Sequence, residues 1–199
     1  MNITIFDYGA GNLHSLAKAL EGPGCVVRLE ADLRRALDTD VLVLPGVGAF
    51  AAAAARMADA RDEARDALRQ GLPCLGICLG MQLLFSASEE GPGAGLGFIN
   101  GVVTRLHAAQ VPQIGWNAID DARDPIFART ALRTAYYANS FVCRPADDTG
   151  VVAWSTHERD RFPAAVRVGN TLGVQFHPEK SSAPGVAFIH QFLHDVLPD

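Results

Sequence analysis

The sequence predicts a doubly wound α/β fold, with a mostly parallel central sheet flanked by helices and additional β segments in the second half of the chain. In the first half, short apolar runs alternate with helical segments, an order that makes consecutive strands parallel. In the second half, short β segments follow one another closely. The 199 residues can bury a sizeable core, and no linker or internal repeat divides them. We therefore expect residues 1–199 to form a single domain.

The first half is expected to supply four strands of the sheet: Ile3–Phe6, Cys25–Leu29, Val41–Leu44 and Cys74–Ile77. Helices are expected at about 12–20, at about 49–70 and from Leu79 onward. In the helix at 49–70, a run of alanines precedes charged residues of alternating sign, such as Asp62 and Arg65. Such pairs add only about a few tenths of a kcal/mol, so this surface is expected to face solvent rather than form a site.

The second half is expected to add six short strands: Val102–Leu106, Ile114–Ile119, Thr134–Tyr137, Val151–Ser155, Ala164–Val168 and Leu172–Phe176. A surface loop rich in Gly, Glu and Ser is expected at 86–97, and a short helix within 120–129. The last helix, at about 185–197, carries an apolar stripe that predicts burial: Val186, Ile189, Leu193 and Val196.

The composition argues against several classes of protein. The net charge is −5 and the arginines are scattered, so nucleic acid binding is not expected. The pair Gly9 and Gly11 lacks the third glycine of a dinucleotide fingerprint, and His190 and His194 lack an acidic partner at metal-site spacing. The cysteines show no metal-like spacing, no signal peptide is visible, and Gly and Pro interrupt the uncharged stretches. We expect a cytoplasmic protein without metal, cofactor or membrane segment.

Cys78 occupies the corner between an expected strand and an expected helix. Gly76 and Gly80 flank it, and glycine tolerates the close backbone approach of a sharp strand-to-helix turn, as in a nucleophile elbow. The first N–H groups of the helix, above all that of Leu79, point toward such a corner. They can favour a thiolate and hold an oxyanion, so Cys78 is a candidate nucleophile. The alternative is a structural cysteine in an ordinary turn.

His177 and Glu179 follow the last expected strand and supply the partners that a nucleophilic cysteine needs. In an extended backbone, side chains two residues apart project to the same side. An imidazole can then take the thiol proton and return it to a leaving amine, while a carboxylate fixes the ring's tautomer and stabilises its cation. Taken alone, a His and a Glu at this spacing are more often a solvated surface turn; together with the elbow they predict a Cys-His-Glu triad.

The segments 76–82, Gly-Ile-Cys-Leu-Gly-Met-Gln, and 177–179, His-Pro-Glu, resemble the class I glutamine amidotransferases. Four further segments narrow the resemblance to the glutaminase subunits of imidazole glycerol phosphate synthase: 7–13, 45–50, 114–117 and 177–181. The resemblance implies the amidotransferase fold and hydrolysis of L-glutamine to glutamate and ammonia through a Cys78 thioester. The ammonia would pass to a cyclase subunit of histidine biosynthesis, in a heterodimer.

The resemblance also implies roles for further residues. It assigns a second N–H of the oxyanion hole to Val47, beside that of Leu79, and substrate contacts to Gly48 and Gln82. The partner implied is a (β/α)₈-barrel cyclase, and motif position makes four residues candidates for its interface: Asn12, Trp116, Tyr137 and Lys180. Gln113 and Asn139 stand where the family pattern has histidines, which leaves the details of substrate or interface hydrogen bonding open.

Two alternative functions remain open from the sequence. The chain resembles, less closely, the triad glutaminases that serve anthranilate, pyridoxal phosphate or guanylate synthesis. It could also be a non-catalytic protein that uses an elbow cysteine as a sensor, although a sensor has no need of His177 and Glu179 in register with Cys78.

Overall fold

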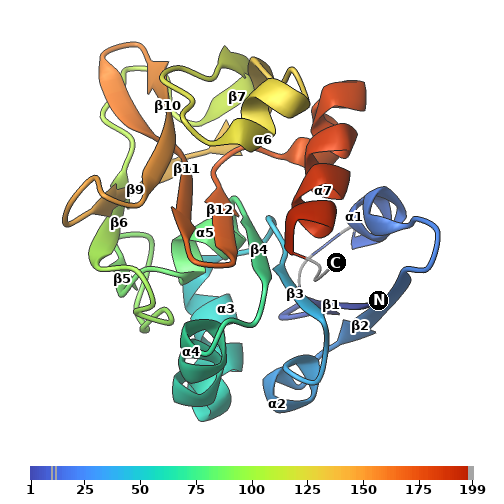
Figure 1. The fold of residues 1–199 in the computed structure, drawn as a ribbon. Helices are drawn as coiled ribbons and strands as arrows, with labels where there is room; N and C mark the ends of the chain where they lie inside the picture. Colours follow the sequence, from blue (N-terminus) through green and yellow to red (C-terminus); the bar gives the residue numbers. More distant parts are fainter. Residues whose placement is uncertain (10, 12, 197–199) are drawn as a thin grey trace.

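A seven-stranded sheet forms the centre of the protein, with the strand order β10-β11-β12-β4-β3-β1-β2 (Figure 1). The computed structural model describes residues 1–9, 11 and 13–196. The strands are β1 (Asn2–Phe6), β2 (Val26–Glu30), β3 (Val41–Leu44), β4 (Cys74–Ile77), β10 (Val151–His157), β11 (Asp160–Val168) and β12 (Thr171–Val174). Five neighbouring strands run parallel: β2, β1, β3, β4 and β12. β11 pairs antiparallel with β12 on one side and with β10 on the other. The prediction of a mostly parallel sheet is confirmed.

Helices cover both faces of this sheet. The core on one face includes α1 (Leu13–Leu20), α6 (Pro125–Arg129) and α7 (Ser182–Val196), and that on the other includes α2 (Leu33–Ala36), α3 (Phe50–Met57), α4 (Arg61–Arg69) and α5 (Leu79–Leu83). Successive strand residues serve opposite faces, because the side-chain period of a strand is two. In β3, for example, Val41 and Val43 pack in the first core, and Leu42 and Leu44 in the second.

Two small sheets lie beside the central one. They contain β5 (Ala87–Ser88), β6 (Gly101–Arg105) and β9 (Phe141–Pro145) in one, and β7 (Gln113–Ala118) and β8 (Thr134–Asn139) in the other. The six predicted strands of the second half are confirmed with shifted ends, whereas β5, β9 and the short α2 were not predicted. Only Ser140 separates β8 from β9, so the usual cluster of turn residues that marks a strand boundary is missing.

The single helix expected at 49–70 is wrong in one respect, because a 3₁₀ turn at Ala58–Ala60 divides it into α3 and α4. A 3₁₀ turn advances each residue further around the axis than an α-helix does. Ala60 therefore faces the core, whereas Arg61, which continues the spacing of Phe50 and Met57, is only partly buried. The break keeps a charged side chain out of the core.

The last helix begins at Ser182, three residues before the predicted start. Ile189 and Leu193 of the predicted stripe are buried, but the adjacent Phe188 and Phe192 contribute more to the core than the partly buried Val186 and Val196. Among the residues that the structure describes, no helix combines the length and apolar character that crossing a membrane requires.

The turn from β4 into α5 depends on contact between backbones. A Cβ atom placed on Gly80 would lie 2.0 Å from the carbonyl oxygen of Leu44 in β3, and one on Gly76 would lie 2.8 Å from the carbonyl oxygen of Gly80. Both distances are far below van der Waals contact. Glycine is required at both positions because helix α5 starts directly against the sheet.

We predict that Gly80→Ala destabilises the protein by about 3 kcal/mol or more, because the obstacle is backbone of a central strand that cannot move aside. Equilibrium denaturation in urea measures the effect. Gly22→Ala is the matched control: its Cβ would meet only the Cys25 sulfur at 3.8 Å, and its effect should stay within about 0.5 kcal/mol. Equal stability of the two variants would contradict the packing described for the elbow.

Candidate active site

Three segments far apart in the chain meet at one edge of the central sheet. β3, β4 and β12 are parallel neighbours, so their carboxyl ends lie side by side, and they are followed by 45–48, by Cys78 and by 175–180. A cavity of about 300 Å³ opens between these segments and 138–141. A crevice at the carboxyl ends of parallel strands is the usual ligand site of an open α/β sheet.

Cys78 stands at the turn between β4 and α5 with φ 48° and ψ −103°. A positive φ is uncommon for a residue with a side chain and marks backbone strain. The surroundings maintain it: the Cys78 N–H donates to the carbonyl of Val174 at 2.7 Å, and Gly76 and Gly80 permit the tight turn. Cys78 is 6% exposed and lines the cavity, as the elbow prediction requires.

His177 and Glu179 form a hydrogen-bonded pair, with 2.8 Å between Nδ1 and Oε1. The route to this contact differs from the prediction, because β12 ends at Val174 and Pro178–Lys180 form a 3₁₀ turn rather than extended backbone. The His177 N–H donates to the carbonyl of Tyr136 at 2.8 Å, which fixes the start of the turn. The 3₁₀ turn then folds the Glu179 carboxylate back onto the imidazole.

The environment of His177 favours its charged form. Burial alone would lower the pKa of this imidazole, but the neighbouring Cys78 sulfur and the Glu179 carboxylate together raise it to about 10. The Glu179 side chain is itself 8% exposed, so little solvent screens the pair. The imidazole thus lies between a carboxylate and a cysteine sulfur, which is the arrangement that activates a nucleophilic cysteine.

The segment 45–48 covers the imidazole from the β3 side. A Cβ on Gly46 would lie 2.8 Å from Cε1 of His177, so this backbone packs directly on the ring. Gly48 has φ +128°, a conformation that favours glycine. The buried Tyr8 hydroxyl donates to the carbonyl of Pro45, and burial and the Cys78 charge raise the pKa of Tyr8, so it remains a donor. Val47 thus lies two residues after Pro45, whose carbonyl is held by this hydrogen bond.

The structure places every residue predicted for the oxyanion hole and the substrate contacts around the same cavity: Val47, Gly48, Leu79 and Gln82. Gln82 is 4% exposed, and its Nε2 donates to the carbonyl of Phe141 at 3.0 Å. Its position on α5, one turn after Cys78, brings it to the cavity, as the spacing along a helix indicates. These placements support the assigned roles without testing them.

Gln175 is a site residue that the sequence analysis missed. It is completely buried, its Nε2 donates to the Cys78 sulfur at 3.5 Å, and its Oε1 accepts from Nε2 of Gln82 at 3.4 Å. The only signal in the sequence was its position two residues before His177, within the predicted strand Leu172–Phe176. No pattern of residue types indicated contact with the sulfur.

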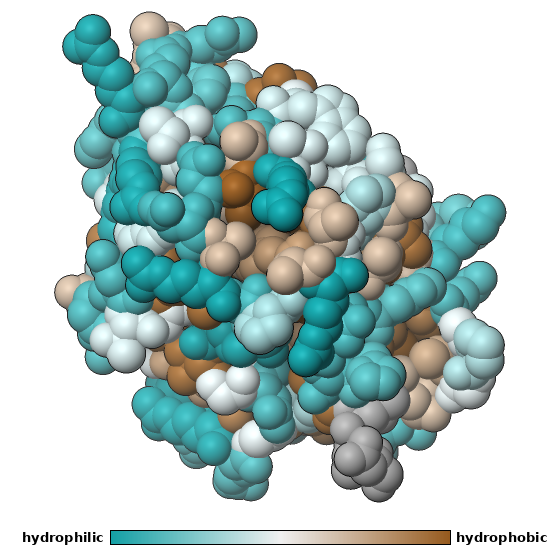
Figure 2. Space-filling view, turned by 45° about the horizontal axis from the view of Figure 1, so that its top comes forward, coloured by the Kyte–Doolittle hydropathy of each residue, from teal (hydrophilic) through white to brown (hydrophobic). Residues whose placement is uncertain are grey.

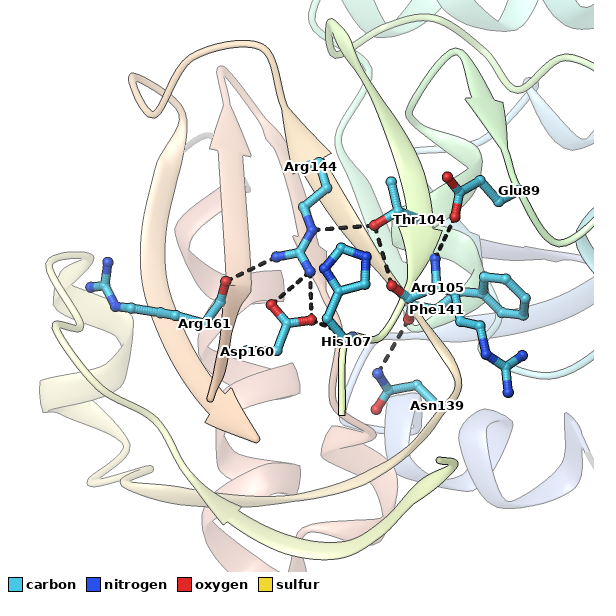
Figure 3. Close-up of polar contacts among 9 residues, drawn as sticks. All are labelled: Glu89, Thr104, Arg105, His107, Asn139, Phe141, Arg144, Asp160 and Arg161. Atoms are coloured by element: carbon cyan, nitrogen blue, oxygen red, sulfur yellow. Dashed lines mark hydrogen bonds and ion pairs between the residues drawn. The ribbon is translucent and has the colours of Figure 1, made fainter. Parts of the chain in front are cut away.

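The two amides at the family's histidine positions are paired in the β7–β8 ribbon, where Gln113 lies opposite Asn139. Both are buried, and neither side-chain oxygen has a hydrogen-bond partner among the residues that the structure describes. Asn139 lines the cavity, and its side-chain amide donates to the carbonyl of Phe141 at 3.2 Å (Figure 3). The same carbonyl oxygen accepts from Gln82. Asn139 therefore belongs to the wall of the site.

The interface candidates divide into three groups. Trp116 is 55% exposed on β7, and Lys180 lines the cavity mouth. Tyr137 is completely buried, with its hydroxyl 2.5 Å from that of Ser155. Its side chain therefore lies in the core and reaches no surface, contrary to the role expected for it. Asn12 lies outside the described residues.

Two further features concern metals and cavities. In the described part of the chain, no group of three or more His, Cys, Asp or Glu side chains is arranged to hold a metal ion. A larger hollow of about 1200 Å³ lies at the amino edge of the sheet, lined among others by Met1, Pro73 and Asn170. None of the predicted site residues that the structure describes borders it, so size does not identify the reactive site here.

Comparisons with known proteins identify the family of the chain. A family model described as "Glutamine amidotransferase class-I" matches residues 4–196. The chain is similar to curated proteins named "Imidazole glycerol phosphate synthase subunit HisH". One from Gloeothece citriformis is 38% identical over 98% of this chain and 96% of its own length. One from Thermus thermophilus is 41% identical over 95% of each chain, and one from Halobacterium salinarum is 40% identical over 96% and 92%.

Solved structures show the same fold. "Crystal structure of glutamine amidotransferase" superposes with a TM-score of 0.74 at 18% identity, covering 98% of both chains. "Structure of PurLQS from Thermotoga maritima" gives a TM-score of 0.75 at 20% identity, covering 99% of both. At these identities the similarity shows the fold alone.

We predict that Glu179→Gln lowers the pKa of His177 from about 10 by roughly 1–3 units, because a carboxylate that favours the imidazolium is removed. Protonation of His177 stabilises the folded protein, because its pKa is about 10 when folded and 6.5 when unfolded. This stabilisation is fully present at a pH below 6.5 and is lost as the pH rises through about 10. In the variant the loss should occur at lower pH. NMR titration of the His177 side chain measures the change, with the exposed Glu21→Gln as the control; an unchanged pKa would refute the pairing.

Proposed function

Because the chain belongs to the class I glutamine amidotransferases, and within them to the HisH subunits of imidazole glycerol phosphate synthase, we propose that it hydrolyses L-glutamine through Cys78, His177 and Glu179. It is then the glutaminase subunit of this synthase of histidine biosynthesis. The observation that carries the residue assignment is the strained elbow that presents Cys78 in one cavity with the buried His177–Glu179 pair. A single domain of residues 1–199 in the cytoplasm is part of the proposal.

The first half of the reaction is acyl transfer to sulfur. The Cys78 thiolate attacks the side-chain carboxamide carbon of glutamine, a C–S bond forms, and the carbonyl π electrons move to oxygen. The N–H groups of Leu79 and Val47 are proposed to hold this oxyanion. When the tetrahedral intermediate collapses, the C–N bond breaks, and the His177 imidazolium gives its proton to the departing nitrogen. The products are ammonia and a thioester on Cys78.

The second half returns the enzyme to its starting state. Neutral His177 takes a proton from water as the water oxygen attacks the thioester carbonyl, and Glu179 stabilises the imidazolium that forms. The C–S bond then breaks, which releases glutamate and restores the thiolate beside the imidazolium. The pKa of His177, raised to about 10, fits a group that must remain protonated until ammonia leaves.

The cavity also offers groups that suit the rest of the substrate. Gly48 and Gln82 are proposed to contact bound glutamine, because both line the cavity close to Cys78. The Glu90 carboxylate and the Lys180 ammonium also line it, so groups of both charges are available for an α-ammonium and an α-carboxylate. A volume of about 300 Å³ fits a small amino acid rather than a polymer.

The relatives are named as subunits of a synthase, so this chain has a partner subunit. We propose that the partner is a (β/α)₈-barrel cyclase that consumes the ammonia. Trp116 and Lys180 are the proposed contacts among the described residues, and Asn12 is retained from its motif position. Ile114 and Trp116 expose apolar surface on β7, 67% and 55% respectively. Figure 2 shows the side on which β7 lies in Figure 1, and apolar residues gather there within a hydrophilic rim.

We predict that Cys78→Ala lowers glutamate release from glutamine by about a thousandfold or more, since removal of the nucleophile abolishes the covalent route. Glutamate is measured enzymatically, first with this chain alone and then with a cyclase subunit and its nucleotide substrate. Cys25→Ala, which removes a thiol remote from the cavity, should retain the activity. Glutamate release by Cys78→Ala at the original rate would overturn the proposed mechanism.

For the interface, we predict that Trp116→Ala weakens binding of the cyclase subunit by about tenfold or more, because a large exposed aromatic side chain is a typical centre of binding energy. Titration calorimetry measures the affinity. Val168→Ala is the control, since Val168 is 40% exposed on β11 and lies away from the cavity. Affinities that respond to Val168 but not to Trp116 would place the interface elsewhere.

A further inference from the structure

We propose that Gln175 is a positioning residue of the catalytic centre, which holds the Cys78 sulfur and the Gln82 amide in register. The inference rests on the proposed function, because it assigns a role within that same site. Gln175 follows the end of β12, and its backbone N–H continues the sheet by donating to the carbonyl of Ala164 at 2.9 Å. Its side chain is fully buried and contacts two residues that line the cavity, Cys78 and Gln82, so a rigid element holds it directly behind the cavity wall.

The Gln175 amide has a single orientation that satisfies its neighbours. Its Nε2 donates to the Cys78 sulfur at 3.5 Å, and its Oε1 accepts from Nε2 of Gln82 at 3.4 Å. If the amide were turned over, two NH₂ groups would face each other and a carbonyl oxygen would face the sulfur. In this turned-over orientation the carbonyl oxygen would repel a thiolate. The native arrangement thus presents a fixed donor to the nucleophile.

The Gln82 side chain, which donates to Gln175, is also anchored by β9. The carbonyl of Phe141 accepts from Gln82 at 3.0 Å and from Asn139 at 3.2 Å. Three residues on, Arg144 places its Nη2 2.7 and 2.6 Å from the two carboxylate oxygens of Asp160, as Figure 3 shows. Burial opposes ionisation of Asp160, but Arg144 and the His107 N–H lower its pKa, so this tie persists at neutral pH.

The Gln175 NH₂ group is a donor that favours the ionised form of the Cys78 sulfur. A thiolate is a far better hydrogen-bond acceptor than a thiol, so the Gln175 NH₂ group favours the ionised sulfur. It acts from the interior side, whereas His177 acts in the cavity. Because a neutral amide does not titrate, Gln175 remains a donor at every pH, and the strength of its hydrogen bond follows the ionisation of the sulfur. The same side chain restrains Gln82, the proposed substrate contact.

The test compares Gln175→Leu with the native protein in two assays. Alkylation of Cys78 by iodoacetamide should require higher pH in the variant, because the thiolate loses a donor. In glutamine hydrolysis, kcat should fall about tenfold to a hundredfold, the loss typical for a hydrogen bond to a charged group, and KM should rise because Gln82 is no longer restrained. Gln175→Glu should move the alkylation profile further in the same direction, since a carboxylate faces the thiolate.

Thr171→Val is the matched control, because Thr171 is a buried polar residue of the same segment that lies away from the cavity. Its hydroxyl oxygen has no hydrogen-bond partner in the described part of the chain. The alkylation profile of Thr171→Val should equal that of the native protein. If Gln175→Leu folds and alkylates with the native pH profile, Gln175 only fills space and the inference is wrong. If the native protein itself does not hydrolyse glutamine, the proposed function is overturned instead.

A measurement on the native protein does not depend on a variant that folds. The side-chain NH₂ resonances of Gln175 should shift with pH in step with the alkylation of Cys78, and this shift should vanish in Cys78→Ala. Resonances that do not respond to ionisation of the sulfur would refute the hydrogen bond.

Discussion

The site depends on the contact between the first turn of α5 and the end of β3. Gly80 lies so close to the Leu44 carbonyl that no side chain fits between them. This contact draws the helix against the sheet and forces Cys78 into a positive φ. A helix that started further from the sheet would let the backbone at residue 78 relax, and the sulfur would turn away from the cavity. The reactivity proposed for Cys78 therefore rests on a backbone contact between two other residues, Gly80 and Leu44.

Strand order then determines what the sulfur meets. β4 lies between β3 and β12, and all three are parallel, so the segments that follow them must meet on one side of the sheet. Gly46 arrives from β3 and packs on the His177 ring, while His177 arrives from β12. β11 and β10 extend the sheet antiparallel beyond β12, so β12 is an interior strand. A rigid interior position suits groups whose separation decides proton transfer.

The parts that the sequence predicted are those encoded by local spacing. The glycines on either side of Cys78 indicate a tight turn, and the two-residue spacing of His177 and Glu179 permits their contact whether the backbone is extended or, as here, a 3₁₀ turn. The parts that it missed depend on tertiary contacts. Gln175 is recognisable only when α5 and the end of β12 are placed together. Tyr137 was an interface candidate by motif position, which does not tell which side of β8 is covered.

Gln113 and Asn139, which stand where the family pattern has histidines, add no charge near the His177–Glu179 pair. Of the described residues that line the cavity, His177 is the only imidazole. A second imidazole at position 139 could compete for the thiol proton or, when charged, oppose the positive charge on His177. Asn139 donates to the Phe141 carbonyl without titrating. Gln82, Asn139 and Gln175 are neutral amides that hold the geometry of the site, and in the proposed mechanism they leave proton transfer at Cys78 to the His177–Glu179 pair.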